Sequence, residues 1–227
     1  GGLLWGLGND RRRLGILGEK AEGGEFCASG YFEADNLMRI DSSNDMRTAD
    51  KIRNTKGIIY KDVSVDGNSV LVVDDKGRRW RLPLGDSLFT RTVNGQKLRI
   101  CREVATERDL LNCHGTFYEL PAENADGYAK IKPIASHGFA IRDFASYRGL
   151  LVMTGLKNNA NGFHVFTSDN RGFAVWAGAI DDLWKLGKPT GHGGPWSSSK
   201  VEKDKQSDPY LFGGYDKREL LLSHTQT

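Results

Sequence analysis

Residues 72–83 read VVDDKGRRWRLP, and residues 110–121 read LLNCHGTFYELP. The two stretches align without a gap: an apolar pair, a polar turn that ends in glycine, an aromatic-bearing run and then Leu-Pro. Short β-branched and aromatic runs separated by Asp, Asn and Gly are typical of β-hairpins, because these turn residues tolerate positive φ. Each stretch therefore predicts two antiparallel strands joined by a tight turn.

Patterns of the same kind continue in both directions from these two hairpins. We expect strands in residues 58–65, 70–74 and 79–82, and strand–turn–strand units in residues 26–42, 150–169 and 210–223. Helical periodicity is nearly absent, since residues 103–111 are the only stretch to consider and their place in the repeat favours strand. Residues 197–208 are polar and aperiodic, which predicts a loop.

The beginning of the chain also repeats its end. Trp5 and Asp10 correspond to Trp176 and Asp181, and the 26–42 unit corresponds to the 210–223 unit. The last unit stops before a tryptophan-bearing strand, and residues 3–8 carry one. We expect residues 3–8 to pair beside residues 219–223 and to close a ring, which would hide two sheet edges. The alternative is a fragment of a longer repeat protein.

Short antiparallel units that recur every roughly 40 to 50 residues are the sequence signature of a β-propeller. The prediction is an all-β fold: a β-propeller of about five four-stranded blades, in a single domain over residues 1–227. The N-terminal strand would close the last blade.

One turn carries a family resemblance. Asp75-Lys76-Gly77-Arg78-Arg79-Trp80 resembles the tail of the Asp-box hairpin of sialidase-type propellers, with Val73 in place of the serine, and residues 168–176 resemble it with one extra residue. The resemblance implies a propeller of the glycosidase or sugar-binding lectin kind. In those proteins the Asp box is a structural hairpin away from the active site, so it implies nothing about catalytic residues.

Composition excludes several classes of function. The net charge of +3 is small and the basic residues are scattered, so we expect no nucleic-acid partner. The longest apolar run, near residues 150–153, is far too short for membrane insertion. No Gly-x-Gly-x-x-Gly, phosphate-binding loop, His-Glu-x-x-His or nucleophile elbow is present, so no cofactor is expected.

The cysteines and the start of the chain bear on compartment. Cys27, Cys101 and Cys113 are odd in number and lack metal-ligand spacing, so no metal site is expected, and a bridge between Cys101 and Cys113 stays open without support. The chain opens with Gly1-Gly2 and enters a strand-like segment directly, which fits removal of a leader. This slightly favours a secreted or periplasmic protein and leaves the compartment open.

Acidic residues follow the aromatic strands at a near-constant distance. Asp10 follows Trp5, Asp86 follows Trp80 and Asp182 follows Trp176. In a propeller these positions converge at the mouth of the central tunnel, so the three acids are candidate catalytic carboxylates of a glycoside hydrolase-like enzyme. The alternative is turn chemistry, because Asp often hydrogen-bonds its own backbone.

Two further groups are candidate binding residues. The first precedes the apolar strand at residues 150–154 and consists of His137, Arg142 and Asp143, which would line the tunnel or form an ion pair within a blade. The second lies in a glycine-rich run and consists of Trp184, His192 and Trp196, which would stack on sugar rings or pack between blades.

These features together predict a carbohydrate-active protein that processes glycans at an acidic central pocket. The partner would be a glycan or another small polar ligand. A non-catalytic, lectin-like glycan-binding module and a protein-interaction scaffold are the alternatives, and fold analogy cannot choose among the three.

Overall fold

The computed structural model describes residues 2–6, 13–19, 26–33, 40–43, 62–73, 76–86, 101–104, 108–120, 131–156, 161–167 and 174–224. Within these ranges the protein is all-β, with short antiparallel strands and one 3-10 helix, η3 (Ile180–Lys185). The strands are β1 (Gly2–Gly6), β2 (Arg13–Glu19), β3 (Phe26–Glu33), β4 (Ile40–Ser43), β5 (Asp62–Val65), β6 (Val70–Val73), β7 (Arg79–Leu82), β8 (Cys101–Val104), β9 (Arg108–Cys113), β10 (Thr116–Leu120), β11 (Lys132–Ser136), β12 (Asp143–Tyr147), β13 (Leu150–Thr154), β14 (Val165–Thr167) and β15 (Ala174–Gly178).

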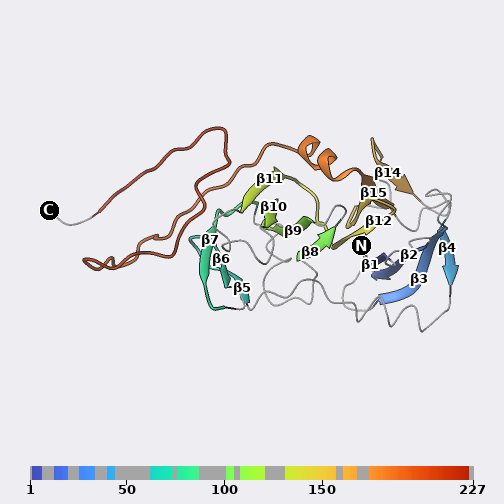
Figure 1. Cartoon of the computed structure of the whole chain (residues 1–227), viewed down its shortest axis with the longest axis horizontal. Coiled ribbons are helices and arrows are strands. Elements are labelled where there is room, and N and C mark those ends of the chain that lie inside the picture. Colours follow the sequence, from blue (N-terminus) through green and yellow to red (C-terminus); the bar gives the residue numbers. More distant parts are fainter. Residues whose placement is uncertain are drawn as a thin grey trace.

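The described strands form three four-stranded sheets and one three-stranded sheet. Their strand orders are β1-β2-β3-β4, β11-β10-β9-β8, β12-β13-β15-β14 and β5-β6-β7. The sheets stand in a row along the long axis of the molecule, with β5–β7 toward one end and β1–β4 at the other (Figure 1). Each is antiparallel and open, so every one of them has two edge strands.

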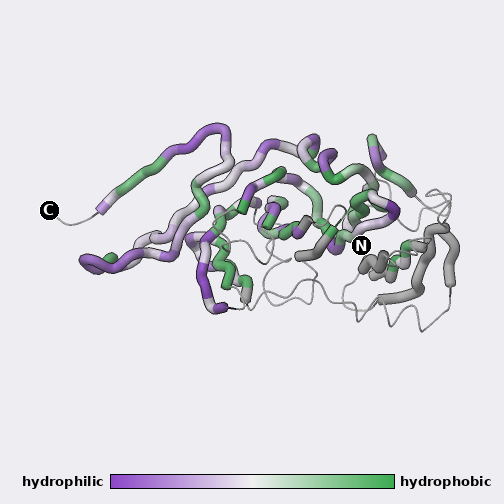
Figure 2. The backbone as a smooth tube through the Cα atoms, viewed as in Figure 1, coloured by the Kyte–Doolittle hydropathy of each residue, from purple (hydrophilic) through white to green (hydrophobic). Residues whose placement is uncertain are grey.

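Each neighbouring pair of sheets shares a hydrophobic core. The first core joins β5–β7 to β8–β11 and includes Val72, Leu82 and Tyr118. The second joins β8–β11 to β12–β15 and to η3, and the third joins β12–β15 to β2 of the N-terminal sheet. Among the residues that Figure 2 colours, many of the apolar ones lie in the strands.

The two middle sheets have a hydrophobic core on each face, and because side chains alternate along a strand, successive residues face different cores. On β9, Leu110 faces the second core and Leu111 faces the first. On β15, Trp176 faces the second core and Val175 the third. All five residues of β15 are buried, which explains its continuous apolar sequence.

The hairpins predicted from turn chemistry are confirmed. β6 pairs with β7 and β9 pairs with β10, both antiparallel. His114 and Gly115 have φ of 51° and 76° at the β9–β10 turn. Two successive residues with positive φ match the right-handed twist of the flanking strands, and glycine adopts that conformation without steric strain.

The five-bladed propeller is wrong. The described sheets form an open row, with the first core at one end and the third at the other, so they do not close around an axis or a tunnel. β1 pairs with β2 in its own sheet rather than beside residues 219–223, which are exposed and form no strand. The ring closure inferred from Trp5 and Trp176 therefore fails, although residues 2–6 do form a strand.

The third sheet departs from the predicted hairpin in residues 150–169. β13 and β14 do not pair with each other, because β15 lies between them and pairs with both. Trp176 lies on β15 and is 5% exposed inside this sheet. The last predicted unit, residues 210–223, is not a hairpin either.

After η3 the chain leaves the sheets as a long segment without regular secondary structure, which we call the arm (residues 187–224). It runs back over β11 to β7 and then away from the body (Figure 1). The predicted loop at residues 197–208 lies within it and is mostly exposed. At Tyr210 the arm forms a parallel bridge with Arg81, so it extends the β5–β7 sheet by a short fourth segment.

Cys113 is buried on β9 and is a free thiol, which excludes the bridge to Cys101. Burial raises the pKa of the Cys113 thiol to about 12. This cysteine therefore packs as a small apolar side chain in the first core.

Candidate functional site

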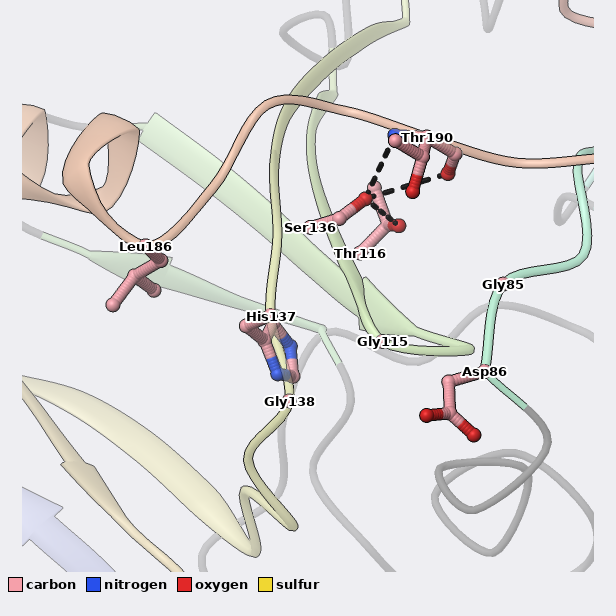
Figure 3. A pocket seen from close by; sticks show the side chains of 9 residues that line it. All are labelled: Gly85, Asp86, Gly115, Thr116, Ser136, His137, Gly138, Leu186 and Thr190. Atoms are coloured by element: carbon pink, nitrogen blue, oxygen red, sulfur yellow. Dashed lines mark hydrogen bonds between the residues drawn. The ribbon is translucent and has the colours of Figure 1, made fainter.

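A pocket of about 270 Å³ lies where the arm crosses the boundary between the β5–β7 and β8–β11 sheets (Figure 3). Its walls come from four places: the segment after β7, the β9–β10 turn with the first residue of β10, the end of β11 with the residues after it, and the chain from the end of η3 into the arm. The lining residues are Gly85, Asp86, Gly115, Thr116, Ser136, His137, Gly138, Leu186 and Thr190.

The hydroxyl of Ser136 is the centre of the polar wall. Ser136 Oγ lies 2.9 Å from the Oγ1 of Thr116 and accepts a hydrogen bond from the Thr190 amide at 2.9 Å. It also lies 3.3 Å from the Thr190 carbonyl, to which it can donate. Figure 3 shows these bonds converging on one oxygen between β11, β10 and the arm. Ser136 thus fixes the arm against the β8–β11 sheet at the pocket.

His137 forms the buried side of the pocket and is 7% exposed. The amide of Phe139 donates to its Nδ1 at 3.2 Å, so the ring proton lies on Nε2, which donates to Oδ1 of Asn112 at 2.9 Å. Burial lowers the pKa of His137 to about 4. The imidazole is therefore neutral at neutral pH, and both of its nitrogens have protein partners.

Asp86 lines the opposite wall, where the chain leaves β7, and is exposed. The preceding amide, Gly85 N–H, donates to Nδ1 of His114 at 2.7 Å, which ties this wall to the β9–β10 turn. Burial lowers the pKa of His114, so this ring also favours its neutral form. Among the residues that line the pocket, Asp86 is the one with a carboxylate side chain. The neighbouring polar groups are the imidazoles of His114 and His137 and the hydroxyls of the polar wall.

The structure places Asp182 elsewhere, in the first turn of η3. Its Oδ2 accepts the Ala179 amide at 2.9 Å, and its Oδ1 accepts from Lys185 Nζ at 2.7 Å. The hydrogen bond from Lys185 is the main reason that the pKa of Asp182 is lowered. This carboxylate caps the helix and does not line the pocket.

The other candidate residues are spread over the molecule. Asp143 is fully buried on β12, where its Oδ1 accepts the Phe144 amide, and Arg142 is half-buried just before it. Trp184 on η3 is 65% exposed and Trp196 on the arm is 44% exposed. His192 lies on the arm, where its backbone pairs with Leu84.

The structure thus brings two predicted site residues, Asp86 and His137, to one pocket. Asp10 lies outside the described residues. Sequence reasoning missed Thr116, Ser136 and Thr190. The available signal was weak: a Ser-His-Gly run at residues 136–138, and a Thr-Gly-His run at residues 190–192 in the glycine-rich segment.

The described residues hold neither a metal-binding cluster nor a membrane-spanning helix. No group of three His, Cys, Asp or Glu side chains there is arranged to hold a metal ion. No helix in the same ranges has the length and apolar character that crossing a bilayer requires.

Comparison of the chain with protein-family models, with curated proteins and with solved structures finds no match.

Proposed function

We propose that the protein binds a small hydroxyl-rich ligand, of the carbohydrate class, in the pocket between Asp86 and Ser136, without catalysing its breakdown. The observation that carries this proposal is the convergence of one carboxylate, three hydroxyl-bearing residues and backbone groups on a volume of about 270 Å³. Pockets for drug-sized ligands are roughly 300–1,000 Å³, so this one suits a single sugar ring.

The chemistry of the walls supports hydroxyl recognition. An ionised Asp86 offers acceptor sites for ligand O–H groups, while Thr116 and Thr190 can donate or accept. Sugar hydroxyls do both, so they match such a mixed set. Because the carboxylate is the ionised side chain of the wall, neutral sugars and amino sugars are favoured over uronic acids.

Binding is favoured over hydrolysis because glycosidases use two carboxyl groups on either side of the scissile bond. Of the described acids, Asp86 is the one that lines the pocket, while Asp182 is engaged in capping η3. The neutral, doubly hydrogen-bonded His137 is also poorly suited to act as a general base, which needs a pKa near the working pH.

The test is a titration of the protein with glucose, mannose, glucosamine and glucuronic acid, followed by NMR of the protein amides. A hexose has about twelve non-hydrogen atoms, and about −0.3 kcal/mol for each gives about −3.6 kcal/mol, a Kd of about 2 mM. We expect shifts at Ser136 and His137 with glucosamine and with neutral hexoses, and weaker ones with glucuronic acid.

Asp86→Asn is the variant that checks the role of charge. It should remove the advantage of glucosamine over glucuronic acid, because the carboxylate is replaced by a neutral amide. Asp204→Asn on the exposed part of the arm is the matched control and should leave the preference intact. Absence of binding by every sugar in the panel would refute the proposal.

A second candidate function, pairing between copies of the chain, is favoured by the end of the arm. Leu220, Leu221 and Leu222 are 70%, 84% and 78% exposed, and they form the apolar stretch near the C-terminal end in Figure 2. Exposed apolar residues on extended backbone can pair with a sheet edge. Sedimentation of the wild type and of Leu221→Asp over a range of concentrations tests it, since a monomer in both cases would exclude self-association.

A further inference from the structure

Part of the arm, residues 190–211, is bound to the body at both ends, and we call it the strap. At the pocket end it is attached to β11, at the other end to β7, and between them to the β5–β6 turn. The backbone contacts are Thr190 N to Ser136 Oγ at 2.9 Å, the two bonds between His192 and Leu84 at 2.8 and 2.9 Å, Gly194 N to Asn68 O at 3.0 Å, Arg81 N to Pro209 O at 2.8 Å and Leu211 N to Arg81 O at 2.8 Å.

Asp208 carries the charged contact at the far end of the strap. Its Oδ1 accepts from Arg79 Nε at 2.9 Å, and its Oδ2 accepts from Arg81 Nε at 3.0 Å. Arg79 and Arg81 are two residues apart on β7, so both side chains lie on one face of the strand. Two arginines on one carboxylate give directional, charge-assisted bonds that hold the strap in one register.

Arg81 also connects the far end of the strap to its middle. Its Nη1 donates to Asp66 Oδ2 and to Ser69 Oγ, both at 2.7 Å. The other oxygen of Asp66 accepts the amides of Asn68 and Ser69, at 2.8 and 2.9 Å, and so shapes the β5–β6 turn. The carbonyl of Asn68 in that turn then accepts the Gly194 amide.

The middle attachment is close to the pocket and is tightly packed. A Cβ on Gly193 would lie 2.1 Å from Asn68 O, and Gly193 has φ of +115°. Thr190, a lining residue of the pocket, is only a few residues earlier in the chain. A displaced β5–β6 turn would therefore move the strap where it forms the pocket wall.

We propose that Arg81 is a positioning residue that couples the two ends of the strap, so that release of Asp208 loosens the wall of the pocket at Thr190. The physical route is a continuous chain of hydrogen bonds from Asp208 through Arg81, Asp66 and Asn68 to Gly194. Contiguous hydrogen-bond networks of this kind can carry energetic coupling between two sites. Only the consequence for ligand affinity rests on the function proposed above.

Amide hydrogen exchange of the intact chain, followed by NMR, tests the coupling without any ligand. In Asp208→Asn we expect the Leu211 amide to exchange about tenfold faster, because a charge-assisted hydrogen bond is lost. The amides of Gly194 and Thr190 should also exchange faster. Glu202→Gln removes an exposed ion pair with Lys205 in the same strap and is the matched control, with no change expected at any of the three amides.

Two results of the exchange experiment would overturn the coupling. Faster exchange at Leu211 with unchanged exchange at Gly194 and Thr190 would mean that the two attachments are independent, which overturns it. Unchanged exchange at all three amides would show that Asp208 does not hold the strap, which also overturns it.

Sugar titrations separate this proposal from the proposed function. If the wild type binds glucosamine, Asp208→Asn should bind it several-fold more weakly, and equal affinity would overturn the link between strap and pocket. If the wild type binds no sugar, the proposed function fails, and the exchange of Thr190 still decides whether the strap is coupled.

Discussion

Arg81 on β7 donates from its Nε to Oδ2 of Asp208 at 3.0 Å, across 127 residues of sequence. The Arg81 side chain is only 12% exposed, and its guanidinium also donates to Asp66 in the β5–β6 turn. An arginine with this many partners holds three parts of the chain in a fixed arrangement. It is the main polar link between the arm and the β5–β7 sheet.

Acid should weaken this link only at low pH. The hydrogen bond from Arg79 is the main cause of the lowered pKa of Asp208, and for Asp66 the bonds from Arg81 and the turn amides outweigh the opposing effect of burial. Folded-state pKa values below the ordinary 3.8 mean that this stabilisation is complete above that pH and is lost as the pH falls through the lowered values. Unfolding of the wild type and of Asp208→Asn between neutral pH and pH about 2 measures it, and the difference in stability should vanish at the acid end. A difference that persists there would argue against an ionic origin.

His137 predicts a second pH dependence in a different range. Its pKa is about 4 in the folded protein against an ordinary value of 6.5, so the unfolded chain binds more protons between these values. The contribution of His137 to the free energy of unfolding is therefore fully present above pH 6.5. It is lost as the pH drops toward about 4, which lowers the free energy of unfolding by roughly 3 kcal/mol. Urea unfolding across this range should show a smaller loss in His137→Gln. His224→Gln, at an exposed position, should keep the wild-type slope.

Ser136→Ala should loosen the pocket wall. The Thr190 amide loses its acceptor and the hydroxyl of buried Thr116 loses a partner, at a cost of about 1–2 kcal/mol. Urea denaturation gives the change in unfolding free energy, with Ser199→Ala on the exposed arm as the control. Equal stability of the two variants would mean that the Ser136 contacts do not contribute.

Gly193→Ala should displace the strap, for two reasons. The added Cβ would lie 2.1 Å from Asn68 O, and the φ of +115° is strained for a residue with a side chain. Gly213→Ala is the matched control, because its Cβ would meet nothing within 4 Å. We expect faster amide exchange at Gly194 and Thr190 only in the first variant. Similar exchange in both would contradict the tight approach to Asn68.

Local features of the fold could be predicted from the sequence because their causes are local. The glycines at positions 77 and 115 mark turns whose positive φ is set by the turn itself, and both hairpins formed as expected. The order of strands is set instead by contacts distant in sequence. Nothing in residues 150–169 indicates that β15 inserts between β13 and β14, so the third hairpin and the propeller built on it were wrong.

In the candidate site too, the residue spacing could be read from the sequence, but the contacts between distant segments could not. Asp86 and Asp182 stand at the same distance from a tryptophan, yet one lines the pocket and the other caps η3. The spacing repeats, but the chain after β15 forms the 3-10 helix η3, whereas residues 83–86, the described residues after β7, form no helical turn. Ser136 and Thr190 could not be paired from sequence, because they meet only where the arm returns across β11.

The position of β15 also constrains the order of events during folding. β14 can pair with β15 through residues close in sequence, whereas β15 reaches β13 only after a longer loop closes. Closing the longer loop costs more chain entropy, so the β14–β15 ribbon should form first and dock as a unit on β12–β13. In the transition state for folding, Val175 would then already be paired with Phe166 on β14, while Val152 on β13 would still be exposed.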